Sequence, residues 1–175
     1  FQSGYGGQKA EQWGADIRAK KETLEQRDAA FEKAEVAEGV DKAKALDEAI
    51  SVVEPKLAVS FYGETVKQIM ELDEKGVGDK YAAIQRTVEF EAGLAELTGK
   101  DLDVEKLAGQ IEKLIKDKRP AAAEGQMALF MRSQRLFGAG NKPAAKTLLM
   151  AAQKLDPESR VGQQIPQILE NFFKD

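Results

Sequence analysis

The chain has 175 residues, of which 26 are basic and 30 acidic, so its formal net charge at neutral pH is −4. It contains no cysteine and no histidine. This excludes disulfides, thiol nucleophiles, Cys/His zinc sites and the side chain most often used as a general base. No apolar run approaches the roughly 18 residues of a membrane-spanning helix. The length allows one domain with a substantial core.

Alanine is abundant and aromatic residues make up only 7% of the chain, a composition that favours helix over sheet. No alternating run rich in Val, Ile and Thr indicates a strand. The sequence therefore predicts an all-α protein.

The charge is distributed unevenly. Residues 1–117 hold 17 basic and 25 acidic side chains, whereas residues 118–160 hold 8 basic and 3 acidic, a net charge of +5. This excess is too small to indicate nucleic-acid binding, and no aromatic residues are interleaved for base stacking. We expect no nucleic-acid partner, and an ordinary solvated surface of mixed charge is the plainer interpretation.

The first residues carry little structural information. Phe1-Gln2-Ser3 resembles the remnant of a tobacco etch virus protease site, and a glycine-rich stretch follows. We interpret residues 1–7 as a cleavage remnant and flexible lead-in, and residues 8–175 as a single helical domain. If the natural N-terminus was removed with a signal peptide, the protein would be exported or periplasmic; its location is otherwise open.

The first predicted helix, over residues 8–38, is long. Apolar residues recur on one side at three- and four-residue spacing, interrupted by Lys20 and Arg27; they are Ala10, Trp13, Ile17, Leu24, Phe31 and Ala34. This stripe could form a coiled-coil-like seam. Because half of the central positions are polar, packing against the next helices of the same chain is the favoured interpretation.

Proline, glycine and acidic residues divide the following region. Asp41 is the expected N-cap of a second helix, and Pro55 opens a third that reaches residue 72. A fourth helix is predicted over 80–97. Asp101 is the expected N-cap of a fifth helix, which ends before Pro120.

Residues 126–157 give the clearest local pattern. They predict an apolar helix that is buried on nearly every side, a turn at 138–141, and a second helix whose apolar residues follow helical spacing. A last helix follows over 161–173, with Pro166 in its first turn or kinking it.

These residues resemble a tetratricopeptide repeat over about 126–159. Ala145, Ala152 and Pro157 stand where the second helix of that repeat has two small residues and its closing proline. In the first helix, Leu129, Ser133 and Leu136 match the large, small and large residues, and Arg132 replaces a leucine. Two further stretches share the second-helix spacing in degenerate form; they are Ala43-Ile50-Pro55 and Ala108-Ile115-Pro120. Chance matches in an alanine-rich chain are the alternative.

The resemblance implies an irregular array of antiparallel helix pairs, a tetratricopeptide-like superhelix, with a long N-terminal helix and a C-terminal capping helix. It also implies a concave face that includes Met127, Phe130, Gln134 and Phe137. Relatives that clamp a peptide carboxylate use lysine and asparagine there, so a clamp of that kind is not expected. Either an apolar peptide binds this groove, or the N-terminal helices fill it.

No residues suggest catalysis, and we expect no enzyme activity, cofactor or metal. Asp101, Asp103, Glu105 and Glu112 have the spacing of calcium-loop ligands, but Lys106 stands where the loop requires glycine. An acidic helix start explains them better. The expected function is a non-catalytic scaffold that binds a protein or peptide. The alternative is a structural accessory or spacer domain of a larger, exported bacterial protein.

Overall fold

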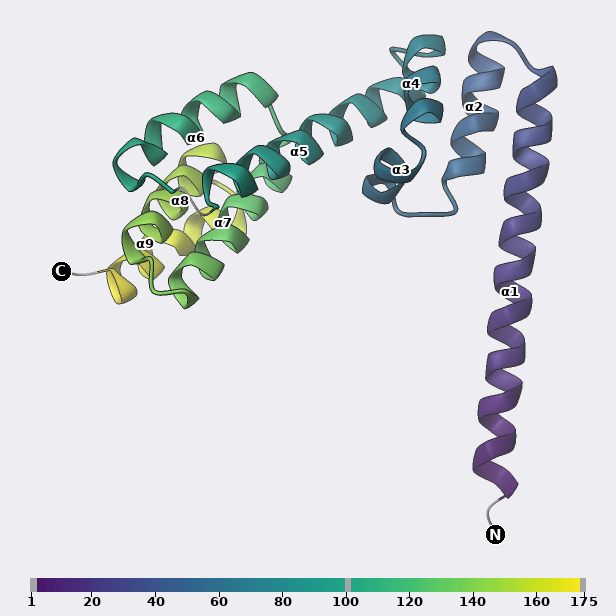
Figure 1. The fold of residues 1–175 in the computed structure, drawn as a ribbon, viewed down its shortest axis with the longest axis horizontal. Helices are drawn as coiled ribbons and strands as arrows, with labels where there is room; N and C mark the ends of the chain where they lie inside the picture. The colour runs from purple at the N-terminus through teal and green to yellow at the C-terminus, as the bar shows by residue number, and fades with distance from the viewer. Residues whose placement is uncertain (1–2, 100–101, 174–175) are drawn as a thin grey trace. The chain divides into compact units, whose positions relative to one another are not determined.

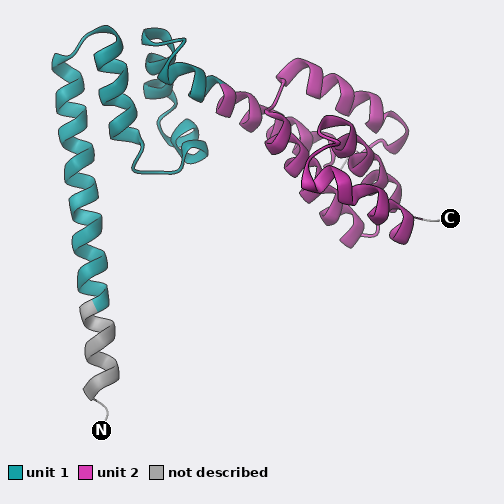
Figure 2. Ribbon diagram, turned by 180° about the vertical axis from the view of Figure 1, so that it is seen from behind, with its two compact units in different colours: residues 1–82 teal, residues 83–175 magenta. Residues whose placement is uncertain are grey.

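The computed structural model describes residues 3–99 and 102–173, with side chains described from residue 12 onward. Within these ranges the chain forms nine α-helices and no strand, which confirms the predicted all-α class (Figure 1). The chain divides into two compact units, residues 1–82 and 83–175 (Figure 2), and each is described by itself. The single domain expected over 8–175 stays a prediction.

Unit 1 contains four complete helices and the first residues of a fifth. They are α1 (Ser3–Val36), α2 (Gly39–Ile50), α3 (Pro55–Phe61), α4 (Gly63–Leu72) and α5 (Val77–Leu97). Helix α2 packs on both α1 and α4, and α3 packs on α4. Several of the buried side chains are small and therefore allow close helix approach; they include Ala30, Ala34, Ala43, Ala45 and Ala49.

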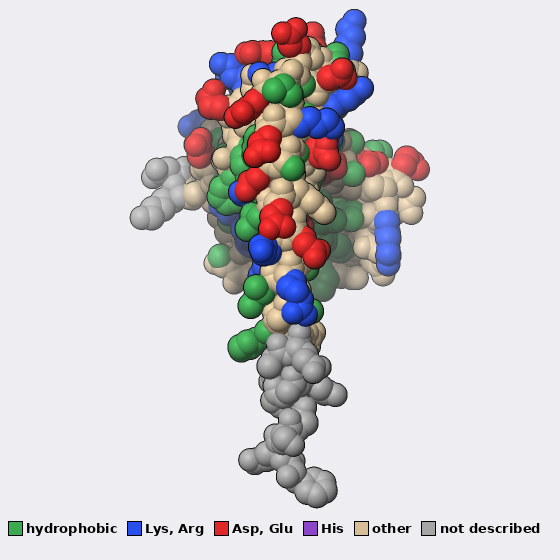
Figure 3. All heavy atoms as spheres, turned by 90° about the vertical axis from the view of Figure 1, so that its right-hand side faces the viewer, with side chains coloured by type: hydrophobic (Ala, Val, Ile, Leu, Met, Phe, Trp, Pro, Cys, Tyr) green, Lys and Arg blue, Asp and Glu red, His purple; other side chains and the backbone are tan. Residues whose placement is uncertain are grey.

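Within the part of α1 whose side chains are described, the apolar stripe packs only at its C-terminal end. Ala34 is buried there, and the Phe31 and Tyr62 ring centroids lie 6.4 Å apart. By contrast Trp13 is 69% exposed and Ile17 68%. The predicted packing along the whole stripe is wrong because α2, with 12 residues, is about 18 Å long, whereas the 34 residues of α1 span about 51 Å. Acidic and basic side chains are interspersed along the exposed part of α1 (Figure 3).

The single helix predicted over 55–72 is interrupted. Pro55 opens α3 as expected, but Tyr62 has φ −119° and ψ 38°, and α4 begins at Gly63. Glycine has a low helix propensity, which favours a break at this point. Phe61, the last residue of α3, is 72% exposed.

The predicted N-cap at Asp41 is also wrong. Helix α2 begins at Gly39, which has a positive φ of 53°, and Glu38 occupies the N-cap without a side-chain hydrogen bond. Asp41 lies inside the first turn, where its negative charge still favours the helix dipole.

Unit 2 consists of the rest of α5 together with α6 (Val104–Lys118), α7 (Ala122–Gly138), α8 (Lys142–Leu155) and α9 (Arg160–Phe172). The predicted helix, turn and helix over 126–157 are confirmed by α7 and α8, which pack along each other. Helix α8 also contacts α6 and α9. Its buried residues join those of the neighbouring helices in one core, which comprises Phe90, Leu94, Leu107, Ile111, Leu129, Ala144, Leu148, Leu149, Ala152 and Ile165.

Two details of this unit differ from expectation. Helix α7 is not buried on nearly every side, because Met127 is 44% exposed and Met131 49%. Pro166 lies inside α9, beyond its first turn, so the first of the two predicted positions is wrong and the kink stays a prediction. Ser159 instead begins α9 as its N-cap, with its hydroxyl accepting a hydrogen bond from the Gly162 N–H at 2.9 Å.

An acidic residue caps the start of α6. The expected cap Asp101 lies outside the described residues. Asp103 is the N-cap, and its carboxylate accepts hydrogen bonds from the backbone N–H groups of Glu105 at 3.2 Å and Lys106 at 3.3 Å. The hydrogen bond from the Lys106 ammonium group and these backbone bonds lower the pKa of Asp103.

We expect the Asp103→Ala variant to have a lower thermal midpoint than the parent protein at neutral pH, because it lacks this cap. A carboxylate with a lowered folded pKa stabilises the fold above its unfolded pKa of about 4 and loses that effect as the pH falls through the folded value. The difference in midpoint between parent and variant should therefore shrink below about pH 4. Asp103→Asn, which can still cap the helix, is the control and should lose less than Asp103→Ala. A difference in midpoint that does not change with pH would contradict the role of the charge.

Candidate functional site

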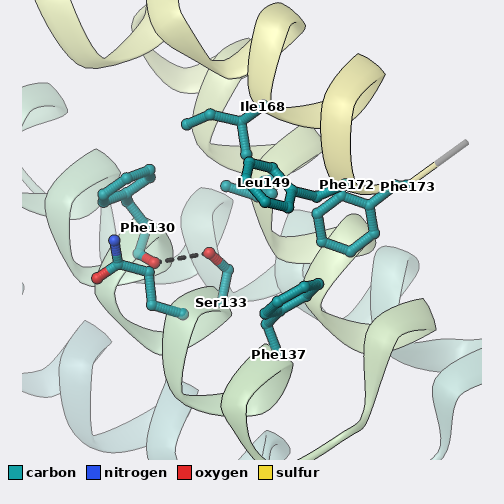
Figure 4. Close-up of a pocket in the computed structure, with 8 residues that line it drawn as sticks. Phe130, Ser133, Phe137, Leu149, Ile168, Phe172 and Phe173 are labelled. Atoms are coloured by element: carbon teal, nitrogen blue, oxygen red, sulfur yellow. Dashed lines mark hydrogen bonds between the residues drawn. The ribbon is translucent and has the colours of Figure 1, made fainter.

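A cavity of about 340 Å³, partly open to solvent, lies among α7, α8 and α9 in unit 2 (Figure 4). Four of its lining residues come from one side of α7, one from α8, and three from α9 and the residue after it. They are Phe130, Ser133, Gln134, Phe137, Leu149, Ile168, Phe172 and Phe173. The lining is predominantly apolar, with polar groups contributed by only two of these side chains.

The spacing of the α7 residues explains why they share this wall. Positions 130, 133, 134 and 137 are three, four and seven residues apart, which places them on one face of a helix. Ser133 is 1% exposed, and its hydroxyl donates a hydrogen bond to the Phe130 carbonyl at 2.6 Å (Figure 4). The hydroxyl hydrogen is thus used within α7, and the small side chain leaves room for the cavity.

Aromatic rings form the end of the cavity near the C-terminus of α9. The Phe137 ring centroid lies 5.3 Å from that of Phe173 and 6.1 Å from that of Phe172, both in edge-to-face arrangements. Such pairs stabilise each other beyond the area they bury. Phe172 is nevertheless 57% exposed, so a large apolar ring remains accessible beside the cavity.

The structure brings three of the four predicted groove residues to this cavity. Phe130, Gln134 and Phe137 line it, whereas Met127 does not. The facing wall, formed by Ile168, Phe172 and Phe173 of α9 and the residue after it, was not predicted. The sequence predicts a helix over 161–173 but does not show which neighbour that helix would meet.

A lysine lies beside the aromatic end of the cavity. Lys142, the first residue of α8, places its Nζ atom 5.8 Å from the centroid of the Phe137 ring, within the range of a cation–π contact. Its side chain is exposed, and no described carboxylate lies within ion-pair distance of it. The cavity therefore combines an apolar interior with a positive charge next to it.

Arg132, which replaces the leucine of the repeat pattern, is used structurally. Its guanidinium donates hydrogen bonds to the Thr98 hydroxyl, to the Thr98 carbonyl at 3.1 Å and to the Ala95 carbonyl at 3.3 Å. A cation there satisfies carbonyls at the C-terminal end of α5 and complements its dipole. A polar contact thus replaces the expected apolar one.

Two smaller cavities lie elsewhere in unit 2. One of about 320 Å³ lies between α6 and α8, where Lys154 and Glu112 form an ion pair at 3.0 Å. The other, of about 250 Å³, lies between α5 and α7 and includes Arg132 and Arg135. The first is spanned by a charge pair, and in the second Arg132 is already bonded to the chain, so neither matches the accessible aromatic wall of the α7–α9 cavity.

Tyr81 is a buried titratable residue that serves packing in unit 1. Burial raises the pKa of Tyr81, and so does the hydrogen bond of 2.6 Å that its hydroxyl donates to the Asp47 carboxylate. This bond connects α5 to α2 within unit 1. Among the described residues no three Asp or Glu side chains gather closely enough to hold a metal ion.

No helix in the described part of the chain is both long and apolar enough to cross a membrane. No protein-family model matches the chain, and comparisons with curated proteins and with solved structures give no match either. The paired helices of unit 2 are compatible with a helical-repeat fold.

Proposed function

We propose that unit 2 is a non-catalytic binding module for a protein or peptide, built as a tetratricopeptide-like helix pair, α7 and α8, with α9 as its capping helix. The observation that carries this proposal is the accessible aromatic cavity. It lies at positions that the repeat register assigns to the concave face, and it includes Phe130, Gln134 and Phe137.

The size of the cavity supports a side chain as its occupant. About 340 Å³ is near the lower limit of small-molecule sites, which typically span 300–1,000 Å³. A single large apolar side chain fits such a volume, whereas a cofactor would fill a larger site. Anchoring one buried side chain in a pocket is a common way for a protein to hold a peptide.

Truncating Phe130 tests this function. We expect Phe130→Ala to weaken the binding of a phenylalanine-containing peptide by about tenfold or more, since anchor truncations commonly cost more than 1 kcal/mol. The probe is a set of capped peptides that differ in one central residue, phenylalanine or serine. Fluorescence anisotropy measures their dissociation constants.

Met127→Ala is the matched control because Met127 is also a large apolar residue of α7 but does not line the cavity. It should leave the dissociation constant unchanged within about twofold. If both variants bind like the parent protein, or if the parent protein binds no peptide of the set, the proposed function is wrong.

The alternative, an accessory or spacer domain of a larger protein, is favoured by a different observation. Helix α1 extends beyond α2, and its apolar residues Trp13 and Ile17 are more than two-thirds exposed. A surface of this kind suits docking to a neighbouring domain. Sequencing the complete gene discriminates the two, because the alternative requires an adjoining domain with a functional site of its own.

A further inference from the structure

The residues around the cavity indicate which kind of peptide would bind there, if unit 2 is the binding module proposed above. We propose that the cavity binds an acidic peptide segment, with an apolar and preferably aromatic side chain inside the cavity and a neighbouring carboxylate paired with Lys142. This inference rests on the proposed function and adds to it a preference for negatively charged peptides.

The cavity walls favour a ring as the buried group. Phe137 is approached edge-on by Phe172 and Phe173, and Phe130 lines the same space. An incoming phenyl ring can add another edge-to-face contact to this cluster, which an aliphatic side chain cannot do. The exposure of Phe172 leaves that end of the cluster accessible to a ligand.

Lys142 supplies the charge preference. Some lysines of unit 2 have carboxylate partners: Lys118 pairs with Glu89 at 2.8 Å, and Lys154 with Glu112 at 3.0 Å. Lys142 instead lies over the Phe137 ring, next to the cavity, with no described carboxylate in reach. A ligand carboxylate beside the buried ring therefore meets an ammonium group that does not have to give up an existing ion pair.

The surrounding charge disfavours a basic segment. Helices α7 and α8, which supply most of the cavity lining, hold five basic side chains and one acidic one, and of the basic ones Lys154 is paired with Glu112. This field attracts acidic peptides and repels basic ones at low ionic strength. Gln134 adds a neutral contact, since its exposed amide lines the cavity and can both donate and accept a hydrogen bond with a peptide backbone.

The experiment compares capped peptides with a central phenylalanine flanked by aspartate, serine or lysine, using the complete chain. We expect the aspartate-flanked peptide to bind about two- to fivefold more tightly than the serine-flanked one, the range of a solvent-exposed ion pair. The lysine-flanked peptide should bind most weakly. Raising the salt concentration should reduce these differences.

Lys142→Glu should remove or invert the preference for aspartate. A glutamate at the first position of α8 suits the helix dipole, so folding should be preserved. Lys113→Glu is the matched control, because it makes the same change of net charge at an exposed position of α6, a helix that contributes no residue to the cavity. It should preserve the order of the three peptides.

The results distinguish the charge preference from peptide binding itself. If the three peptides bind equally, or if Lys142→Glu leaves the preference unchanged, the inference about charge is overturned, while binding that is sensitive to Phe130→Ala still supports the proposed function. If none of the peptides binds the parent protein, the proposed function fails as well.

Discussion

Replacing Leu149 by alanine should lower the free energy of unfolding of unit 2 by roughly 2–5 kcal/mol. Leu149 lies on α8, is 3% exposed and belongs to the core that α8 shares with its neighbours. It also lines the α7–α9 cavity. Truncation would extend that cavity into the core, so the loss combines the transfer of the removed methyl groups with the unfilled volume.

Chemical denaturation followed by circular dichroism measures this change, and hydrogen exchange of the α7 and α8 amides assigns it to unit 2. Met150→Ala is the matched control, because Met150 is the next residue of the same helix and is 49% exposed. Its loss should stay within about 0.5–1 kcal/mol. A loss below about 1 kcal/mol for Leu149→Ala would show that α8 is not packed as described.

Short-range patterns predicted the α7–α8 pair well. Helix α7 ends at Gly138, and the turn that follows contains Gly140, which adopts a φ of 85° that favours glycine. Small residues at positions 145 and 152 are fully buried where the two helices approach closely. These features depend on residues within one turn or one helix face, so a single sequence contains the necessary information.

Features that depend on distant partners were not predicted. The spacing of Trp13, Ile17 and Leu24 identified a helix face correctly, but not that α2 is too short to cover it. In the same way the sequence predicted one helix over 55–72, but the chain breaks at Tyr62 and Phe61 is exposed. Periodicity shows which residues share a face, whereas the length and position of the covering helix decide whether that face is buried.

The sequence predicted the part of the candidate site that lies on α7 and not the part that other helices supply. The repeat register brought together Phe130, Gln134 and Phe137 because they lie on one helix. The wall formed by α9 and the nearby Lys142 depend on how three helices meet, and no local pattern contains that information. Met127 fitted the register and lies outside the cavity, which shows that the register alone does not fix the extent of a groove.

A buried glutamine links three helices of unit 2, and no pattern in the sequence predicts this contact. Gln126 is 2% exposed, near the start of α7. Its Nε2 atom donates hydrogen bonds to the carbonyls of Ala152 at 3.0 Å and Asp156 at 2.6 Å, and its Oε1 atom accepts one from the Ser159 hydroxyl. One side chain therefore joins α7 to the end of α8 and to the N-cap of α9. A polar residue near a helix start usually faces solvent, so only the packed structure shows this role.

Gln126→Leu should lower the free energy of unfolding by roughly 2–4 kcal/mol, although leucine is similar in size and more apolar. Helix ends leave their last carbonyls without intrahelical partners, and the substitution removes the donor that satisfies Ala152 and Asp156. The Ser159 hydroxyl lies 3.1 Å from the Asp156 carbonyl and can compensate in part. The Ala152 carbonyl has no such substitute among the hydrogen bonds of the described residues.

Gln134→Leu is the matched control for this prediction, because it makes the same change on an exposed position of the same helix. Its effect should stay within about 0.5 kcal/mol. Combining Gln126→Leu with Ser159→Ala should cost less than the two separate losses together, since both remove the same hydrogen bond. Equal effects of the two leucine substitutions would mean that Gln126 does not hold the three helices together. In that case the orientation of α9, which supplies one wall of the cavity, would depend on apolar contacts, those of the buried Ile165 and of the partly buried residues beside it.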